Sequence, residues 1–386
     1  MDVHHKAVYI LRAQQGGGKW YDRGVCRAQD FLHCPKPRAP ARRGRGARDR
    51  MVRVNTATRV LSPVEGLQGE LAQDMAAVNA LIRERMASEH APRIPEVTAH
   101  LVDAGGKRLR PLLTLAAARL CGYAGADHVK LAATVEFIHT ATLLHDDVVD
   151  ESERRRGRPT ANLLWDNKSS VLVGDYLFAR SFQLMVETGS LRALHILSNA
   201  SAVIAEGEVL QLASAESLAT TEDIYLRVIR GKTAALFAAA TEVGPVIAGA
   251  DEALVNGLRD YGDALGVSFQ IADDLLDYGG MSAALGKNVG DDFRERKMTL
   301  PVIRAVRAGD AEERAFWSRV IEQGDQRDGD LETALELMRR HGSLESTRET
   351  AYAHAARARA ALEIAPEGRL RDLLSDLADF VVARLA

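Results

Sequence analysis

From Met51 onward, apolar residues are interspersed with Ala, Glu and Arg in long runs that contain no proline, a pattern typical of helices. Only eight prolines occur in this part of the chain, and none lies in 160–244, 246–300 or 302–365. β-Branched alternation with Asn-Gly or Asp-Gly turns, the pattern of a β-hairpin, is missing. The predicted helices span about residues 64–88, 107–121, 128–151, 169–187, 190–213, 222–229, 232–249, 251–278, 298–307, 312–323, 330–341, 343–363 and 367–384.

Glycines such as Gly105, Gly122, Gly189 and Gly342 separate the predicted helices. No repeat with a period of 20–50 residues indicates a solenoid. We therefore expect residues 51–386 to form one large all-α domain.

Residues 1–50 differ from the rest in both pattern and charge. They hold 12 Lys and Arg against 4 Asp and Glu, a balance of +8, which leaves −11 for the other 336 residues within the total of −3. No apolar periodicity runs through them, and we expect a disordered basic extension. Their four aspartates argue against an organellar transit peptide. A basic arm for nucleic acid or acidic lipid is an alternative, but we favour Met51 as the native start.

The length of 386 residues allows a large buried core. The contents of 46% hydrophobic and 27% charged residues are ordinary for a soluble protein. No apolar stretch approaches the roughly 20 residues that cross a bilayer. Cys26, Cys34 and Cys121 have neither metal nor disulfide spacing, which indicates a reduced, cytoplasmic protein.

The stretch LLHDDVVDESERRRGRP carries five acidic residues from Asp146 to Glu153 and then three arginines. Asp146, Asp147 and Asp150 form a D-D-x-x-D motif in a predicted helix, where residues four apart share a face. Converging carboxylates repel one another unless a cation lies between them, and oxygen ligands suit Mg²⁺ with substrate phosphates. Alone, the motif is weak evidence, because a solvated helix end carries similar charges.

The same spacing recurs in FQIADDLLDY, at Asp273, Asp274 and Asp277. This second triplet is embedded among apolar residues, so it is not an ordinary exposed charged face. Two matching carboxylate triplets, 127 residues apart from Asp146 to Asp273, favour a metal site over a solvated surface.

Several basic groups complement the acidic motifs. Lys107 and Arg110 lie at a predicted helix start, a position that favours anions rather than cations, so ordinary surface charges are the weaker interpretation. Further candidates for hydrogen-bond donors to a substrate phosphate are Arg155, Arg156, Lys232, Thr233 and Lys287. The stretch RGKTAALF ends like a Walker A loop, but Leu226 stands where that motif needs glycine and no strand precedes it.

Taken together, these motifs resemble the trans-isoprenyl (polyprenyl) diphosphate synthases, and most of all the long-chain octaprenyl, solanesyl and decaprenyl members. Eight blocks occur in the order seen in that family: GGKRLRP, FIHTATLLHDDVVDE, RRGRPTAN, VLVGDYLFA, AEGEVLQL, GKTAALF, FQIADDLLDY and LGKNVGDDFRERKMTLP. The resemblance covers about residues 65–385. It implies a single helical bundle of the isoprenoid synthase type with a deep central cavity.

The resemblance also implies a role for individual residues. Mg²⁺ ions, three per site, would be held by Asp146, Asp150, Asp273 and Asp277. The catalytic residues would be Asp146, Asp147, Asp150, Lys232, Asp273 and Asp274. The allylic diphosphate contacts would be Arg155, Lys232, Thr233, Gln270 and Lys287. The isopentenyl diphosphate contacts would be Lys107, Arg110, His139 and Arg156.

The implied activity is a Mg²⁺-dependent head-to-tail (1'-4) condensation of isopentenyl diphosphate with farnesyl or geranylgeranyl diphosphate. Ala141 and Thr142 stand where short-chain members of the family place a bulky aromatic residue, and Ile138 lies about one turn deeper. The resemblance therefore implies a long all-trans polyprenyl product, destined for a quinone side chain.

Other readings of the motifs remain open. A shorter-chain synthase is one, and a non-catalytic subunit of a heteromeric synthase is another, although both acidic motifs are complete. A terpene cyclase would need no isopentenyl diphosphate site. The presence of His139 and Arg156, which match that site, therefore argues against a cyclase. The acidic balance of the main domain opposes nucleic acid as a partner. The family resemblance further implies a homodimer, with peripheral membrane contact for product release.

Overall fold

The computed structural model describes residues 61–88, 90–103, 106–155, 157–279 and 290–385, which belong to one compact unit, Arg59–Ala386. The predictions made for residues 1–50, for Arg156 and for Lys287 lie outside the described residues.

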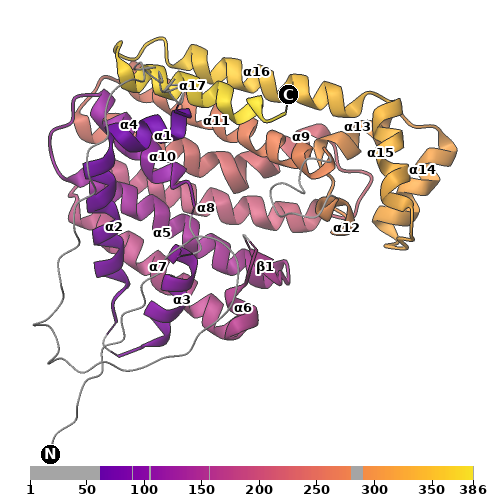
Figure 1. The fold of residues 1–386 in the computed structure, drawn as a ribbon, viewed down its shortest axis with the longest axis horizontal. Coiled ribbons are helices and arrows are strands. Elements are labelled where there is room, and N and C mark those ends of the chain that lie inside the picture. The colour runs from indigo at the N-terminus through magenta and orange to yellow at the C-terminus, as the bar shows by residue number, and fades with distance from the viewer. Residues whose placement is uncertain (1–60, 89, 104–105, 156, 280–289, 386) are drawn as a thin grey trace, which may run out of the picture. The chain divides into compact units, whose positions relative to one another are not determined.

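The described residues fold almost entirely into helices (Figure 1). The α-helices are α1 (Pro63–Glu70), α2 (Ala72–Met86), α3 (Arg93–Asp103), α4 (Leu109–Leu120), α5 (Asp127–Val149), α6 (Ala161–Leu164), α7 (Asn167–Glu187), α8 (Leu191–Ser214), α9 (Glu222–Ile229), α10 (Ala235–Ala248), α11 (Glu252–Tyr278), α12 (Asp291–Arg294), α13 (Leu300–Ala308), α14 (Ala311–Trp317), α15 (Asp330–Arg340), α16 (Ser343–Ala361) and α17 (Arg369–Ala383). Two π-helical turns are η1 (Arg230–Ala234) and η3 (Ser318–Glu322), and a two-stranded hairpin comprises β1 (Arg154–Arg155) and β2 (Arg158–Pro159).

The all-α prediction is confirmed, but several short elements were not predicted. The helix predicted at about 64–88 is broken at Leu71, where φ is −107° and ψ is 17°. Helix α3 was missed, although its Pro95 lies in the first turn, where a proline removes no intrahelical hydrogen bond. Helices α6 and α12 and the β1–β2 hairpin were also missed, since elements of two to four residues carry no readable periodicity.

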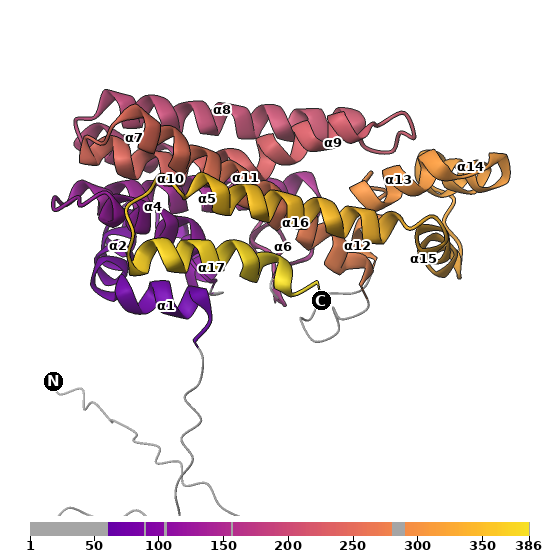
Figure 2. The same cartoon turned by 90° about the horizontal axis from the view of Figure 1, so that it is seen from above.

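Helix α10 lies at the centre of the bundle, where it packs against α4, α5, α8 and α11. Helix α7 packs along α5. Helix α16 lies over α11 (Figure 2). Gly244 lets α10 approach α4 closely, because a Cβ there would lie 2.5 Å from the backbone nitrogen of Ala118. Helix α4 also packs against α5, which carries the first acidic motif.

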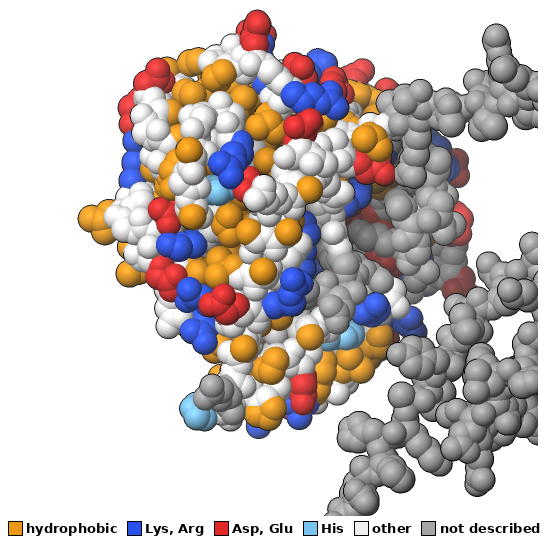
Figure 3. Space-filling model, turned by 60° about the vertical axis from the view of Figure 1, so that its left-hand side comes forward, with side chains coloured by type: hydrophobic (Ala, Val, Ile, Leu, Met, Phe, Trp, Pro, Cys, Tyr) orange, Lys and Arg blue, Asp and Glu red, His pale blue; other side chains and the backbone are white. Residues whose placement is uncertain are grey.

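Helices α13, α14 and α15 lie at one end of the bundle, away from α2, in both ribbon views (Figures 1 and 2). On the face drawn in Figure 3, described hydrophobic side chains alternate with separate groups of basic and of acidic residues. Among the described residues visible on that face, the basic side chains form no broad continuous area of the kind that binds nucleic acid. None of the described helices is long and apolar enough to cross a membrane.

Candidate active site

The first acidic motif lies at the C-terminal end of α5. The helix ends at Val149, so that Asp150 is its C-cap rather than an internal residue as predicted. Asp147 is fully buried, and its Oδ1 accepts a hydrogen bond of 2.7 Å from Nε of Arg155. Its Oδ2 is buried without a hydrogen-bond partner. Asp146 and Asp147 therefore face different surroundings, although they are neighbours in sequence.

The β1–β2 hairpin folds the arginines back onto the acidic motif. Arg155 pairs with Arg158 across the hairpin, and Gly157 adopts a φ of 75°, which favours glycine. Arg155 was predicted to contact a substrate phosphate, and that contact stays a prediction. In this structure Arg155 forms an ion pair with Asp147. A fully buried carboxylate without such a partner would cost several kcal/mol, which explains the pairing.

The second acidic motif lies in the last two turns of α11. Asp273 is about a third exposed, whereas Asp274 and Asp277 are buried. Asp277 accepts hydrogen bonds from the backbone N–H groups of Asp291 (3.2 Å) and Asp292 (3.0 Å), at the start of α12.

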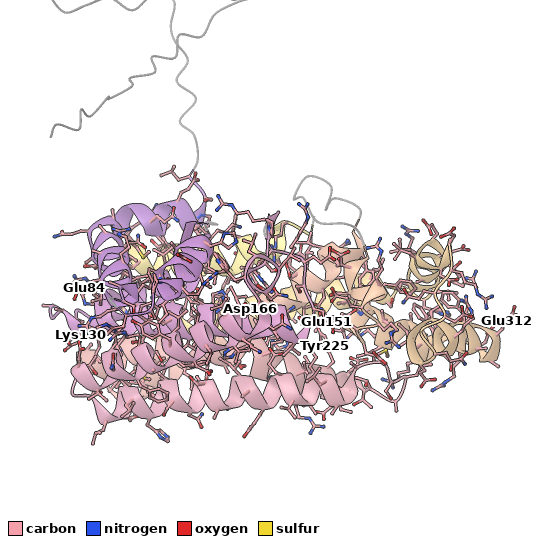
Figure 4. All side chains as sticks on the ribbon, turned by 90° about the horizontal axis from the view of Figure 1, so that it is seen from below. Glu84, Lys130, Glu151, Asp166, Tyr225 and Glu312 are labelled. Atoms are coloured by element: carbon pink, nitrogen blue, oxygen red, sulfur yellow. The ribbon has the colours of Figure 1, made fainter. Side chains whose placement is uncertain are left out.

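Asp274 is bonded on both oxygens. The hydroxyl of Tyr225 donates to Oδ2 at 2.6 Å, and Nε2 of Gln270 donates to Oδ1 at 2.8 Å. The hydroxyl of Thr233 in turn donates to Oε1 of Gln270 at 2.7 Å. Tyr225 belongs to α9 and was not predicted as a site residue. Tyr225 is buried, whereas Glu312 points outward at one end of the molecule (Figure 4).

The pKa of Asp146 is raised to about 7, mainly by burial; the charge of Lys232 opposes the rise, and the carboxylates of Glu208 and Asp150 add to it. Burial likewise raises the pKa of Asp274 to about 6. It raises the pKa of Asp292, and the charge of Asp274 adds to that effect. Crowded, desolvated carboxylates of this kind are stabilised by a cation.

The donor set fits a hard divalent cation. Among the described residues, no three His, Cys, Asp or Glu side chains converge closely enough to hold a metal by themselves. Mg²⁺ does not need such a cage, because it binds through one or two carboxylates and completes its shell with phosphates and water. The buried Oδ2 of Asp147 and the all-oxygen motifs are consistent with that type of site.

The π-helical turn η1 carries Lys232 and Thr233. Gly207 and Gly231 bring α8 and η1 into backbone contact, since a Cβ on Gly231 would lie 2.9 Å from Cα of Gly207. The contact places Glu208 beside Lys232, with 2.8 Å between Oε2 and Nζ. π-Helical turns occur frequently at functional sites, and neither this turn nor Glu208 was predicted.

A cavity of about 410 Å³ joins the predicted isopentenyl diphosphate residues to the second motif. The residues that line it and matter here are Lys107, Arg110, His139, Phe269, Asp273, Asp277 and Arg384. Nη1 of Arg110 lies 3.2 Å from Nε2 of His139, and its guanidinium lies 4.5 Å from the ring centre of Phe237. With Arg108, which also lines the cavity, four Lys and Arg side chains share one concave surface.

Arg384, the C-cap of α17, was missed because no local motif surrounds it. Its guanidinium lies 5.2 Å from the ring centre of Phe269, and its Nη2 lies 3.9 Å from Oδ1 of Asp273. That Nη2 is buried without a hydrogen-bond partner. Burial lowers the pKa of Lys107, and the charge of Arg384 lowers it further. The two cations therefore raise the local positive potential at the cavity wall.

Lys297 is a further charged residue that the sequence analysis missed, although the quoted block LGKNVGDDFRERKMTLP contains it. Burial would lower the pKa of Lys297, but Asp292, Glu295 and Asp150 raise it above its ordinary value. Asp150 belongs to the first motif, and the backbone N–H of Asp292 donates to Asp277 of the second. Lys297 therefore interacts electrostatically with the first motif and with the segment bonded to the second.

The predicted chain-length residues lie beneath the first motif. Ile138 and Ala141 are fully buried in the core, and the half-buried Thr142 donates its hydroxyl to the carbonyl of His139 at 2.9 Å. None of the three lines the cavity described above. Their role in product length stays a prediction.

Comparison with known proteins identifies close relatives. The polyprenyl synthetase family model matches residues 91–338. The octaprenyl diphosphate synthase of Escherichia coli is 49% identical over 313 residues, 81% of this chain and 96% of that protein. The all-trans-nonaprenyl-diphosphate synthase (geranyl-diphosphate specific) of Rhodobacter capsulatus is 44% identical over 327 residues, 84% of this chain and 97% of that protein.

Solved structures agree in fold. A decaprenyl diphosphate synthase from Rhodobacter capsulatus is 73% identical, with a TM-score of 0.82 over 84% of this chain and all of that one. A polyprenyl synthase from Caulobacter crescentus, complexed with calcium and isoprenyl diphosphate, is 53% identical, with a TM-score of 0.80 over 85% of this chain and all of that one.

Proposed function

Because this chain belongs to the polyprenyl synthetase family, we propose that it joins isopentenyl diphosphate head-to-tail to an allylic diphosphate and repeats the step to build a long all-trans polyprenyl diphosphate. The observation that carries the proposal is the cavity that unites Lys107, Arg110 and His139 with Asp273 and Asp277. A cavity with cations on one wall and a carboxylate motif on the other suits two diphosphates and a divalent cation.

The relatives make octaprenyl, nonaprenyl and decaprenyl diphosphates by name, which supports a long product. Chains of that length are side chains for membrane quinones, and we assign the product to that use. We place its synthesis in the cytoplasm. The small side chains of Ala141 and Thr142, with Ile138 below them, are proposed to leave room for the growing chain.

Each substrate has its own set of residues in this proposal. The allylic diphosphate is held by Arg155, Lys232, Thr233, Gln270 and Lys287. Isopentenyl diphosphate is held by Lys107, Arg110, His139 and Arg156. The divalent cations, three Mg²⁺ ions, are held by Asp146, Asp150, Asp273 and Asp277, and Asp147 and Asp274 orient their neighbours.

The chemistry needs no side-chain nucleophile. Lys232, which now pairs with Glu208, turns to the allylic diphosphate and stabilises the negative charge that grows as the carbon–oxygen bond breaks. Bound Mg²⁺ supplies further neutralisation of that leaving group. The double bond of isopentenyl diphosphate attacks the allylic cation at C1. A proton from C2 of the isopentenyl unit then passes to the departing diphosphate.

Lys107, Arg110 and His139 contribute by orientation. They fix the isopentenyl diphosphate so that its double bond faces the allylic carbon, which replaces an encounter in solution by a positioned reaction. The buried setting also excludes water, which would otherwise capture the cation as an alcohol.

The test is incubation of the purified protein with Mg²⁺, radiolabelled isopentenyl diphosphate and farnesyl diphosphate, followed by chromatography of the dephosphorylated products. A ladder that ends at eight to ten isoprene units is expected by analogy with the relatives. Absence of label in any prenyl product would refute the proposal. A ladder that ends at four units or fewer would support the shorter-chain alternative.

We also propose that the protein is a homodimer through α7 and α8. These neighbouring helices expose a row of large apolar side chains, at Val171, Leu172, Phe182, Val186, Leu191, Val209 and Leu212. A stable interface buries about 800 Å² per partner, and two long helices offer that area. A second copy supplies the same apolar surface, as the two-fold symmetry of a dimer requires.

Light scattering should give twice the chain mass of 42.0 kDa. Phe182→Glu with Leu212→Glu should give monomers, whereas Tyr352→Glu, at an exposed position on α16, should leave the mass unchanged. A wild-type monomer that binds phospholipid vesicles would assign the same surface to membrane contact instead.

A further inference from the structure

The hydroxyl of Tyr225 is 49 residues from Asp274 in sequence and 2.6 Å from its Oδ2 in space. We propose that Tyr225 is a positioning residue that holds Asp274, and with it the second acidic motif, in register with the segment that carries Lys232. The inference rests on the proposed function, because it concerns how the diphosphate and its divalent cations are held.

The hydrogen bonds form a closed ring. Tyr225 and Thr233 lie eight residues apart on the continuous segment of α9 and η1. Tyr225 bonds Asp274 directly, and Thr233 bonds it through Gln270. Lys232 lies between them on this segment. The ring therefore connects the segment of Lys232, which is predicted to bind the allylic diphosphate, to the second acidic motif at two points.

Both ends of the ring are rigid. Tyr225 and Asp274 are only 5% and 6% exposed, so neither side chain has room to turn away. Helix α9 is held at its start by the side chain of Thr221, which caps it, and by an ion pair of 3.0 Å between Glu222 and Arg304 of α13. Motion of Lys232 relative to the motif is thereby restricted.

The donors to Asp274 are neutral, and this distinguishes the second motif from the first. Asp147 in the first motif is neutralised by the guanidinium of Arg155. A phenol and an amide orient Asp274 without cancelling its charge. These hydrogen bonds also oppose the rise in the pKa of Asp274 that burial causes.

A purely structural tyrosine is available on α11 as a matched control. Tyr261 is fully buried, and its hydroxyl donates to the carbonyl of Leu374 at 2.8 Å, well before the motif. Tyr225→Phe and Tyr261→Phe each delete one buried hydroxyl and one hydrogen bond. Both variants should lower the melting temperature by a similar amount.

Binding of inorganic diphosphate in the presence of Mg²⁺, measured by calorimetry on the full chain, separates the two variants. Tyr225→Phe should weaken this binding roughly tenfold, the size expected for one lost hydrogen bond to a charged group, and Tyr261→Phe should not change it. The KM for farnesyl diphosphate should rise with Tyr225→Phe, while the KM for isopentenyl diphosphate stays within about twofold of the wild type.

A double-mutant cycle tests whether Tyr225 acts through Asp274. If it does, Tyr225→Phe added to Asp274→Asn should weaken diphosphate binding no further than Asp274→Asn alone. Additive losses, or equal diphosphate binding by Tyr225→Phe and Tyr261→Phe, would overturn the inference. Those results leave the proposed function intact as long as the wild type forms polyprenyl products.

Discussion

Replacement of Arg384 by alanine should weaken the binding of isopentenyl diphosphate and leave the binding of the allylic diphosphate unchanged. Arg384 comes from the end of α17 and faces the same cavity as Lys107 and Arg110. Its Nη2 is buried without a hydrogen-bond partner, and the nearest carboxylate oxygen, on Asp273, is 3.9 Å away. A diphosphate oxygen in the cavity would supply the missing acceptor.

The magnitude follows from the exposure of the side chain. A charge-assisted hydrogen bond is worth about 1.5–3 kcal/mol. About a third of the Arg384 side chain is exposed, so solvent screening favours the lower end, about 1.5 kcal/mol. This corresponds to roughly a tenfold increase in KM for isopentenyl diphosphate. Loss of the contact with Phe269 should cost a further ~0.5–1 kcal/mol of folding stability.

The assay is steady-state incorporation of labelled isopentenyl diphosphate at saturating farnesyl diphosphate, and then with the two substrates exchanged. Lys107→Ala should behave in the same way as Arg384→Ala. The control is Arg369→Ala, because Arg369 is largely exposed in the first turn of the same helix and does not line the cavity. An unchanged KM for isopentenyl diphosphate, or an equal rise for both substrates, would refute the assignment of Arg384.

Four other substitutions test the rest of the site. Asp146→Ala and Asp273→Ala should each lower turnover by about 10³-fold or more with an unchanged circular dichroism spectrum, and near-normal turnover would contradict the metal assignment. Ala141→Tyr should shift the product ladder to shorter chains, and an unchanged chromatogram would remove the chain-length role. Because burial raises the pKa of Asp146 to about 7, the folded protein binds that proton more tightly than the unfolded chain, and stability is lost as the pH rises toward and past 7. In metal-free protein, the gain in melting temperature of Asp146→Asn over the wild type should therefore widen from pH 5 to pH 8, and a constant gap would contradict the shift.

Much of the secondary structure follows from local sequence. The long helices α5, α7, α8, α11 and α16 lie close to their predicted bounds, because their periodicity and lack of proline are properties of consecutive residues. The elements that escaped prediction have other origins. In the hairpin at Arg154–Pro159, Arg155 donates a hydrogen bond to a buried carboxylate, and α3 packs against α7.

In the candidate site, too, some features follow from local sequence and others depend on the tertiary structure. The D-D-x-x-D spacing alone indicates that Asp146 and Asp150, and likewise Asp273 and Asp277, project from one side of a helix. Which of these carboxylates is exposed, paired or used as a cap is not visible in that spacing. Asp277 caps α12 and Asp147 pairs with Arg155, and both roles depend on segments that return to the motif from elsewhere in the chain.

The sequence by itself determined an all-helical chain with two metal-type carboxylate motifs and the basic blocks of a diphosphate enzyme, since each of these is written in neighbouring residues. Only the tertiary structure decided that Tyr225 donates a hydrogen bond to Asp274, that Glu208 pairs with Lys232 and that Arg384 lines the cavity. The physical reason is that these contacts join residues 24 to 111 positions apart. Burial of apolar surface brings them together, and a lone tyrosine, glutamate or arginine in the sequence carries no sign of its partner.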